Sequence, residues 1–164
     1  MQTQVAILMG SENDWLLVRK AADVFDSFGI NYDVQVMSAH RTPERVREYV
    51  TKTAVENGVQ VFIGAAGLAA HLPGVIASLT TKPVIGIPIK SALDGLDALL
   101  SIAQMPPGIA VAAVAIDGAV NAAVLAVQML ALSSEELTKK LTEYRVKMAD
   151  TIAKKNDALR DNIK

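Results

Sequence analysis

The segment Ser-Ala-His-Arg-Thr-Pro, residues 38–43, holds the two side chains best suited to chemistry, His40 and Arg41. An arginine guanidinium presents a fixed fork of N–H donors that matches a phosphate group. A histidine titrates near neutral pH and is suited to moving one proton. The pair predicts a site that binds a phosphorylated molecule and transfers a proton on it. The alternative is structural: a histidine satisfied by backbone groups beside an arginine in a surface salt bridge.

Polar residues also fill the segment Met-Gly-Ser-Glu-Asn-Asp-Trp, residues 9–15. Ser11 and Asn13 can donate hydrogen bonds to an anion at the start of the next helix, where backbone N–H groups also favour one. Asp14 can accept hydrogen bonds from ribose hydroxyls. Alternatively, Ser11 or Asp14 only caps the helix. The segment is neither a P-loop nor a Gly-x-Gly-x-x-Gly motif, which argues against a triphosphate or a dinucleotide as ligand.

A third segment, residues 64–74, is made almost entirely of small residues around His71. Such residues let backbone N–H groups approach a ligand closely. The alternatives are tight packing of a helix on a sheet or between subunits, and a His71 that caps a helix or fills a polar niche. With two histidines, no cysteine and no paired acidic residues nearby, a metal site is not expected.

The strands and helices that position these three segments can be predicted from apolar runs and from helical spacing. Four mostly apolar runs predict buried strands, and the more polar run at 32–37 is expected nearer an edge of the sheet. The expected buried strands are residues 5–9, 59–63, 84–87 and 109–115. The expected helices are residues 15–28, 42–57 with Thr42 as cap, 73–79, 94–102, 119–132 and, behind a Ser133–Glu136 capping box, 134–157.

This alternation predicts an α/β fold, a three-layer doubly wound parallel sheet of flavodoxin-like size. We expect one domain over residues 1–164, with the helix at 134–157 packing outside the core. Ligands of such folds bind at the carboxyl ends of the strands. The loops there are residues 10–14, 38–42 and 64–71, and the last two contain both histidines of the chain.

Charge is distributed very unevenly along the 164 residues. The net charge of −1 argues against a general nucleic-acid binder, and the absence of cysteine excludes disulfides and Cys-ligated metals. Only five of the 78 residues from 57 to 134 are charged. We expect part of this block, above all residues 98–132, to be buried between copies of the chain. The plainer alternative is a central sheet with its covering helices.

Residues 98–116 form an uncharged run of 19 residues, which by length alone could cross a bilayer as a helix. Gln104 and the pair Pro106-Pro107 interrupt it, so no membrane helix and no membrane partner are expected. Residues 104–108 instead predict a rigid turn at a lid edge or an interface. Because the N-terminus has neither a basic stretch nor a cleavable apolar segment, we expect a cytoplasmic location.

Five segments together resemble the PurE family of purine biosynthesis: MGSENDW, SAHRTP, AAHLPG, LLSIAQMPPG and NAAVLAVQML, spread from Met9 to Leu130. The resemblance implies an isomerase of the mutase branch (class I) that acts on N5-carboxyaminoimidazole ribonucleotide. The carboxylate would leave the exocyclic nitrogen N5 as CO2 and be recaptured at ring carbon C4, giving 4-carboxy-5-aminoimidazole ribonucleotide. The resemblance implies no ATP, metal or organic cofactor. It also implies a homo-octamer, coupled in function to the ATP-dependent synthetase that makes the carbamate.

The resemblance further implies roles for individual residues. His40 matches the family's catalytic histidine and would shuttle the proton between the ring and the leaving group. The phosphoribosyl part would be bound by Ser11, Asp14 and Arg41, with Asn13 and Ser38 in the same site. The carboxylate and CO2 would be held by the backbone around Gly67, Ala69, Ala70 and His71, together with Leu72.

Two positions depart from the pattern usual in the family. Asn13 replaces a serine of Gly-Ser-x-Ser-Asp-Trp, and its longer side chain is expected to change the phosphate contact. Leu68 stands in a glycine position, where it is expected to restrict the backbone or narrow the CO2 pocket. Two other functions stay open: the related carboxylase that takes free CO2 and 5-aminoimidazole ribonucleotide, and a non-enzymatic sensor of phosphate ligands.

Overall fold

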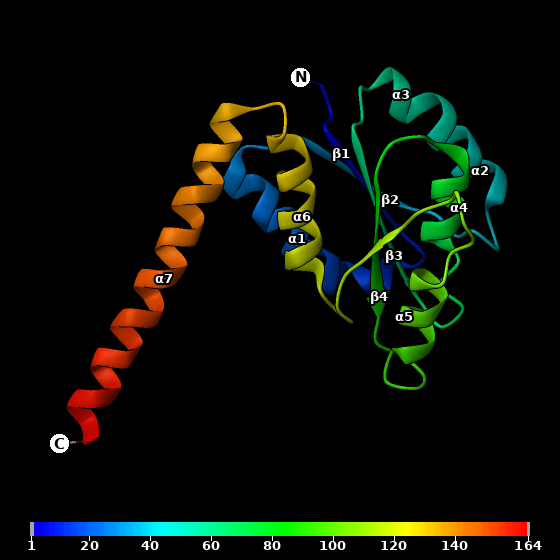
Figure 1. Cartoon of the computed structure of the whole chain (residues 1–164). Helices are drawn as coiled ribbons and strands as arrows, with labels where there is room; N and C mark the ends of the chain where they lie inside the picture. The colour runs from blue at the N-terminus through cyan, green and yellow to red at the C-terminus, as the bar shows by residue number, and fades with distance from the viewer. Residues whose placement is uncertain (1, 164) are drawn as a thin grey trace.

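Five parallel strands form a central sheet in the order β2-β1-β3-β4-β5 (Figure 1). The computed structural model describes residues 2–163, so Met1 and Lys164 lie outside the described residues. This strand order is the doubly wound, flavodoxin-like order, so the predicted fold class is confirmed. The strands are β1 (Val5–Met9), β2 (Tyr32–Val36), β3 (Val61–Gly67), β4 (Val84–Ile89) and β5 (Ala112–Ala113).

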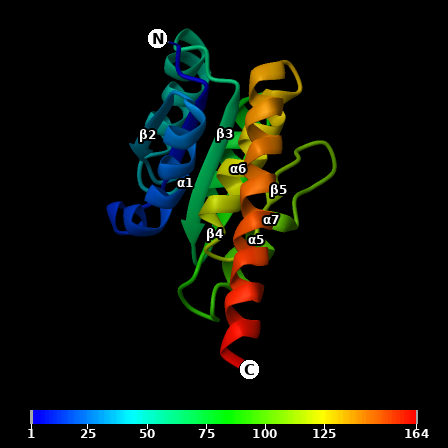
Figure 2. The ribbon, with the colours of Figure 1, turned by 90° about the vertical axis from the view of Figure 1, so that its left-hand side faces the viewer.

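Helices cover both faces of this sheet and make two separate apolar layers. One face packs against α1 and α6, and the other against α2 with its continuation, α4 and α5 (Figure 1). Figure 2 shows α1, α6 and α7 in front of the sheet. The helices are α1 (Trp15–Phe28), α2 (Pro43–Glu48), α3 (Ala54–Glu56), α4 (Leu72–Leu79), α5 (Leu96–Ala103), α6 (Ala119–Ala131) and α7 (Glu135–Ile163), with a 3-10 turn at Glu12–Asp14 and a π-helical turn at Tyr49–Thr53.

Helix α1 has the predicted bounds because local signals define both of its ends. Its buried residues recur at helical spacing on one side, and Gly29 ends it with φ +72°, a conformation that favours glycine. Strand β2 lies at the edge of the sheet, as its polar residues predicted. Helix α6 ends within one residue of its predicted end.

Strand β3 is displaced from its predicted position at residues 59–63. It continues to Gly67, so residues 64–67 are strand and not loop. Gly64 pairs with Leu8 of β1, and Ala66 pairs with Pro88 of β4. Hydrogen bonding to a neighbour on each side therefore holds a run of small residues extended, although its composition resembles a loop.

The predictions for the next two strands were also wrong in length. Strand β4 runs through Pro88 to Ile89, whereas β5 has two residues in place of the predicted seven at 109–115. Strand β5 pairs only with Ile85 and Gly86, so Pro88 lies past its end. The Pro88 carbonyl accepts a hydrogen bond from the Asp117 N–H, at 2.8 Å. Proline is tolerated in this strand because β5 does not reach it, so no ladder hydrogen bond on that side requires its missing N–H.

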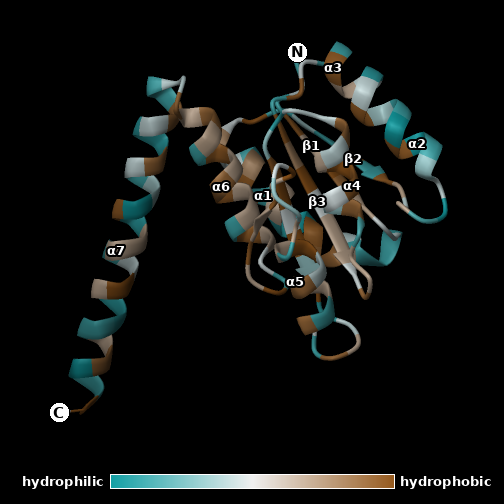
Figure 3. Cartoon of the chain, turned by 45° about the vertical axis from the view of Figure 1, so that its right-hand side comes forward, coloured by the Kyte–Doolittle hydropathy of each residue, from teal (hydrophilic) through white to brown (hydrophobic). Residues whose placement is uncertain are grey.

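The last helix begins and ends differently from the prediction. Ser134, and not Ser133, caps it: the Ser134 Oγ accepts a hydrogen bond from the Leu137 N–H at 3.3 Å. The Ser133 hydroxyl instead donates to the Leu130 carbonyl, at 3.4 Å. Helix α7 continues to Ile163, beyond the predicted end at 157, and projects away from the sheet (Figure 1). Hydrophobic and hydrophilic residues alternate along this projecting part (Figure 3).

Among residues 2–163, none of the helices has both the length and the hydropathy needed to cross a membrane.

The predicted helix at 42–57 contains the π-helical turn at Tyr49–Thr53, which places a buried tyrosine against the polar strand β2. The Tyr49 hydroxyl donates to the Asp33 carboxylate at 2.6 Å, and the Gln35 amide donates to the same carboxylate at 3.0 Å. Burial, and then the Asp33 carboxylate, raise the pKa of Tyr49 above its ordinary value, so the hydroxyl stays protonated and donates. The Asp33 carboxylate on edge strand β2 thus has a hydrogen-bond donor in the helix layer that covers the sheet.

We expect Tyr49→Phe to lower the free energy of unfolding by about 1–2 kcal/mol, because the carboxylate loses its short hydrogen bond. Chemical denaturation measures this difference. Tyr32→Phe is the matched control, since its hydroxyl makes only an exposed bond of 3.4 Å to Asp26. Equal losses in the two variants would show that the Tyr49 bond adds nothing to stability.

Candidate functional site

A cavity of about 690 Å³ opens at the carboxyl ends of β1 to β4. Ten of the eleven residues predicted for the site line it. The exception is Ala70, whose side chain is buried in the core beside α4. The lining residues named in the prediction are Ser11, Asn13, Asp14, Ser38, His40, Arg41, Gly67, Ala69, His71 and Leu72.

The loop after β1 is held by its own hydrogen bonds. The Ser11 Oγ accepts from the Asn13 N–H at 3.2 Å, so Ser11 caps the 3-10 turn, the role that its structural alternative proposed. Asp14 makes no capping bond to α1. Burial raises the pKa of Asp14 above its ordinary value; a hydrogen bond from the Ser11 backbone lowers it, and the charge of Glu12 raises it. Because the Asp14 carboxylate does not cap α1 and is only half-buried, it is available to a ligand.

The loop after β2 is braced both internally and to the loop after β1. Thr42 was expected to cap the next helix, but its hydroxyl bonds Ser38 instead: it accepts from the Ser38 N–H at 2.9 Å and donates to the Ser38 carbonyl at 3.1 Å. The Arg41 backbone N–H donates to the Ser38 Oγ at 3.2 Å. The Arg41 guanidinium donates to the Gly10 carbonyl at 2.9 Å. This bond orients the guanidinium beside Ser11, and its remaining donors can bind an anion.

The two histidines meet across the cavity. The Nε2 atom of His40 lies 2.7 Å from the Nδ1 atom of His71, and the rings pack edge to face with centroids 4.8 Å apart. At this distance one ring nitrogen carries the hydrogen and the other accepts it. The structure therefore shows a hydrogen-bonded pair of histidines from positions 31 residues apart in the chain, and not a His40 satisfied by backbone groups.

The end of β3 combines packing with an uncommon backbone conformation. A Cβ atom on Gly64 would lie 3.1 Å from Pro73, so this glycine allows α4 to pack closely on β3, as the packing alternative for this segment proposed. Leu68 has φ +55°, a conformation that costs a residue with a Cβ atom roughly 1–2 kcal/mol. The expected restriction at Leu68 is thus a strained conformation next to the cavity.

Sequence reasoning missed a fourth loop, after β4. Ile89, Lys90 and Ser91 also line the cavity. The signal was present in the sequence, because Lys90 is one of the few charges in the central block. The sequence predicts that β4 ends at residue 87, three residues before Lys90. Because β4 in fact ends at Ile89, Lys90 is the first residue after the strand.

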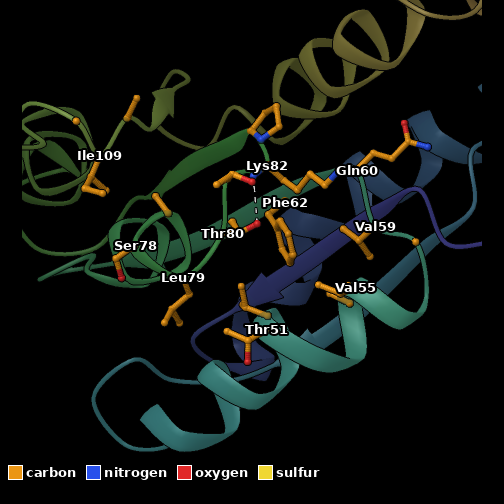
Figure 4. A pocket seen from close by; sticks show the side chains of 18 of the residues that line it. Thr51, Val55, Val59, Gln60, Phe62, Ser78, Leu79, Thr80, Lys82 and Ile109 are labelled. Atoms are coloured by element: carbon orange, nitrogen blue, oxygen red, sulfur yellow. Dashed lines mark hydrogen bonds between the residues drawn. The ribbon is translucent and has the colours of Figure 1, made fainter.

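A larger groove, of about 1170 Å³, lies at the other end of the sheet (Figure 4). It runs between the π-helical turn with α3 and the residues after α4, around Phe62. Among the described residues that line it, Lys82 alone is titratable. The groove therefore offers little for catalysis, and the smaller cavity with the histidine pair is the candidate active site. No group of three or more His, Asp or Glu side chains that could hold a metal ion occurs in residues 2–163.

The model of the family described as AIR carboxylase matches residues 4–151, which include every element from β1 to most of α7. The chain belongs to the AIR carboxylase family. Among solved structures the chain is similar to PurE from Treponema denticola, which is 30% identical over 95% of this chain and 98% of that one and superposes with a TM-score of 0.87. The T. denticola PurE2-S38D structure gives a TM-score of 0.88 at 29% identity, over 97% of this chain and 99% of that one.

Two curated relatives, both mutases, match this chain over nearly their whole length. The N5-carboxyaminoimidazole ribonucleotide mutase of Methanocaldococcus jannaschii is 52% identical over 98% of this chain and 99% of its own. The mutase of Bacillus subtilis is 48% identical over 97% and 99%. A third relative, the chloroplastic phosphoribosylaminoimidazole carboxylase of Vigna aconitifolia, is 44% identical over 96% of this chain, which spans 28% of that longer protein.

We expect Asp14→Asn to raise the free energy of unfolding near pH 7. The folded protein holds the Asp14 proton more tightly than the unfolded chain does, so wild-type stability falls as the pH rises through the raised pKa. The gap between variant and wild type should close at acid pH, where the wild-type carboxyl is protonated. Denaturation curves across pH measure the gap, with exposed Asp150→Asn as control. A gap that does not change with pH would contradict the burial argument.

Proposed function

We propose that the chain converts N5-carboxyaminoimidazole ribonucleotide to 4-carboxy-5-aminoimidazole ribonucleotide, as an isomerase of purine biosynthesis. The observation that carries the proposal is the 2.7 Å contact of His40 with His71 in the cavity at the β1–β3 crevice. The reaction moves one proton as well as one carboxylate, and this pair is a proton carrier. The mutases of M. jannaschii and B. subtilis, identical at about half of the positions, support the same reaction.

The phosphoribosyl group would lie over the loops after β1 and β2. Arg41 is oriented by its bond to Gly10, and the Ser11 and Asn13 side chains lie in the same cavity. Asp14 would accept hydrogen bonds from the ribose hydroxyls, most strongly when its carboxylate is ionised. Ser38 is occupied by bonds to Thr42 and to the Arg41 backbone, so its role would be to hold the loop in place.

The carboxyl transfer needs one proton delivered and one removed. As the bond between N5 and the carboxylate breaks, CO2 leaves and N5 takes a proton from His40. Ring carbon C4 then attacks the trapped CO2, and the C4 proton passes to His40, which restores aromaticity and the starting state of the histidine. His71 would orient the imidazole of His40, because the two share one hydrogen. The small residues Gly67 and Ala69, with Leu72, would enclose the CO2.

The two alternatives from the sequence are less well supported. The relatives that match over their full lengths carry the name of a mutase, whereas the V. aconitifolia carboxylase matches over 28% of its length. A sensor would not need a second histidine within hydrogen-bond distance of the first. We also propose one catalytic domain over residues 1–164, with no cofactor.

Turnover of wild type beside His40→Asn tests the reaction. The wild type should convert N5-carboxyaminoimidazole ribonucleotide, and the variant should lose at least about 100-fold in kcat while it keeps most of its affinity, because only the transition state needs the proton transfer. 5-Aminoimidazole ribonucleotide with bicarbonate is the second substrate to assay. Turnover confined to that mixture would favour the carboxylase, and an unaffected His40→Asn variant would favour the sensor.

We also propose that the chain works as a homo-oligomer, an octamer by its family resemblance. The accessible surface is 9500 Å², against about 8,000 Å² for a compact monomer of this mass. Leu93, Leu96 and Leu100 are exposed on and before α5, in the block that is nearly free of charge. On α7, the exposed Met148, Ile152, Leu159 and Ile163 extend the stripe that begins with buried Leu137.

Light scattering should give a mass near eight times the 17.4 kDa of one chain. Replacing both Met148 and Ile152 by Glu should shift the protein to smaller species, because the charges fall on the apolar stripe of α7. Lys147→Glu with Lys154→Glu, which lie away from this stripe on the same helix, is the control for added negative charge. A stable wild-type monomer at micromolar concentration would rule out this assembly.

We propose a cytoplasmic location and functional coupling to the ATP-dependent synthetase that makes the carbamate. The chemistry of the substrate supports the coupling, because a carbamate loses CO2 readily and should be consumed close to where it forms.

A further inference from the structure

We propose that Lys90 and Ser91, on the loop after β4, bind the carboxylate that migrates. This inference rests on the proposed function and assigns the part of the cavity that sequence reasoning left out. Lys90 and Arg41 are the two lysine or arginine side chains among the described residues that line the cavity. The substrate has two anionic groups, a phosphate and a carboxylate, at opposite ends of the molecule.

The strand order separates these two cations. Arg41 follows β2 and Lys90 follows β4, and the strands between them are β1 and β3. Three steps across a sheet amount to about 14 Å, at roughly 4.8 Å a step. Both side chains are long enough to reach inward over the cavity from opposite ends. A nucleotide whose phosphate lies at Arg41 therefore extends its imidazole past the histidine pair toward Lys90.

Ser91 lies directly against the segment proposed to hold CO2. A Cβ atom built on Gly67 would be 3.7 Å from the Ser91 Cβ and 3.4 Å from the Ile89 carbonyl oxygen. The Ser91 hydroxyl is thus beside the end of β3, where the carboxylate must be before it leaves and after it is recaptured. A hydroxyl donor and an ammonium group together suit a carboxylate.

The loop that carries both residues is held in place by a hydrogen bond to the turn before α6. The Lys90 N–H donates to the Asp117 carboxylate at 2.9 Å, and Asp117 itself has φ +58°. Leu93 and Asp94, further along the same loop, have φ +46° and +53°. Such conformations are rare for residues with a Cβ atom and persist where the surrounding structure holds them. The backbone of Lys90 is therefore placed before substrate arrives.

The Lys90 side chain already has a carboxylate partner that a substrate can replace. Its Nζ atom lies 3.1 Å from the Asp94 carboxylate, and the two side chains are 59% and 90% exposed. Exposed ion pairs of this kind contribute little stability, so exchanging Asp94 for a substrate carboxylate costs little.

Binding of two ligands that differ by the carboxylate tests the proposal. Calorimetry on Lys90→Gln should show about five- to tenfold weaker binding of 4-carboxy-5-aminoimidazole ribonucleotide, the loss expected for one partly exposed charged contact. Binding of 5-aminoimidazole ribonucleotide, which lacks the carboxylate, should change less than about twofold on the same grounds. Lys82→Gln, an exposed lysine at the other end of the sheet, is the matched control and should change neither.

Lys90→Arg should restore most of the affinity, and Ser91→Ala should weaken the carboxylated ligand selectively. Equal losses for both ligands, or no loss, would overturn the inference while leaving the reaction in place. Wild-type turnover is measured on the same preparations. If the wild type does not turn over N5-carboxyaminoimidazole ribonucleotide, the proposed function fails and this inference fails with it.

Discussion

Pairing of β1 with β3 at the centre of the sheet is the constraint on which the rest of the structure depends. Val5–Met9 is buried along its whole length and pairs residue by residue with 61–65 of β3. The ladder continues into the site, since the Gly10 N–H donates to the Ala65 carbonyl at 3.2 Å. After these strands the chain turns to opposite faces, to α1 on one and α4 on the other. The crevice between the two loops follows from that divergence.

The cavity is held rigid by short bonds between its loops. Arg41 ties the loop after β2 to the one after β1, and Asp117 ties the loop after β4 to the turn before α6. The non-glycine residues with left-handed φ that the described chain contains gather at this end of the sheet, around Leu68, Lys90 and Asp117. Strain held by the surrounding fold at a ligand site is a known form of pre-organisation.

Much of the fold could be predicted because its signals are local. Periodic burial and Gly29 define α1, and alternation with polar residues places β2 at an edge. The failures occur where local composition and tertiary pairing disagree. Residues 64–67 and Pro88 have loop-like compositions, yet partners on neighbouring strands hold them extended. The run at 109–115 has the apolar composition of a strand, but only Ala112 and Ala113 pair with β4.

The sequence by itself determined the class of fold, the family and the residue types of the site, because strand–helix alternation and the motifs around Ser11, His40 and His71 are contiguous in the chain. Only the tertiary structure decided that His40 bonds His71, that Ala70 faces the core, and that Lys90 and Ser91 join the cavity. These facts depend on strand order and on where each strand ends. Both are set by hydrogen bonds between residues distant in sequence, which no local pattern encodes.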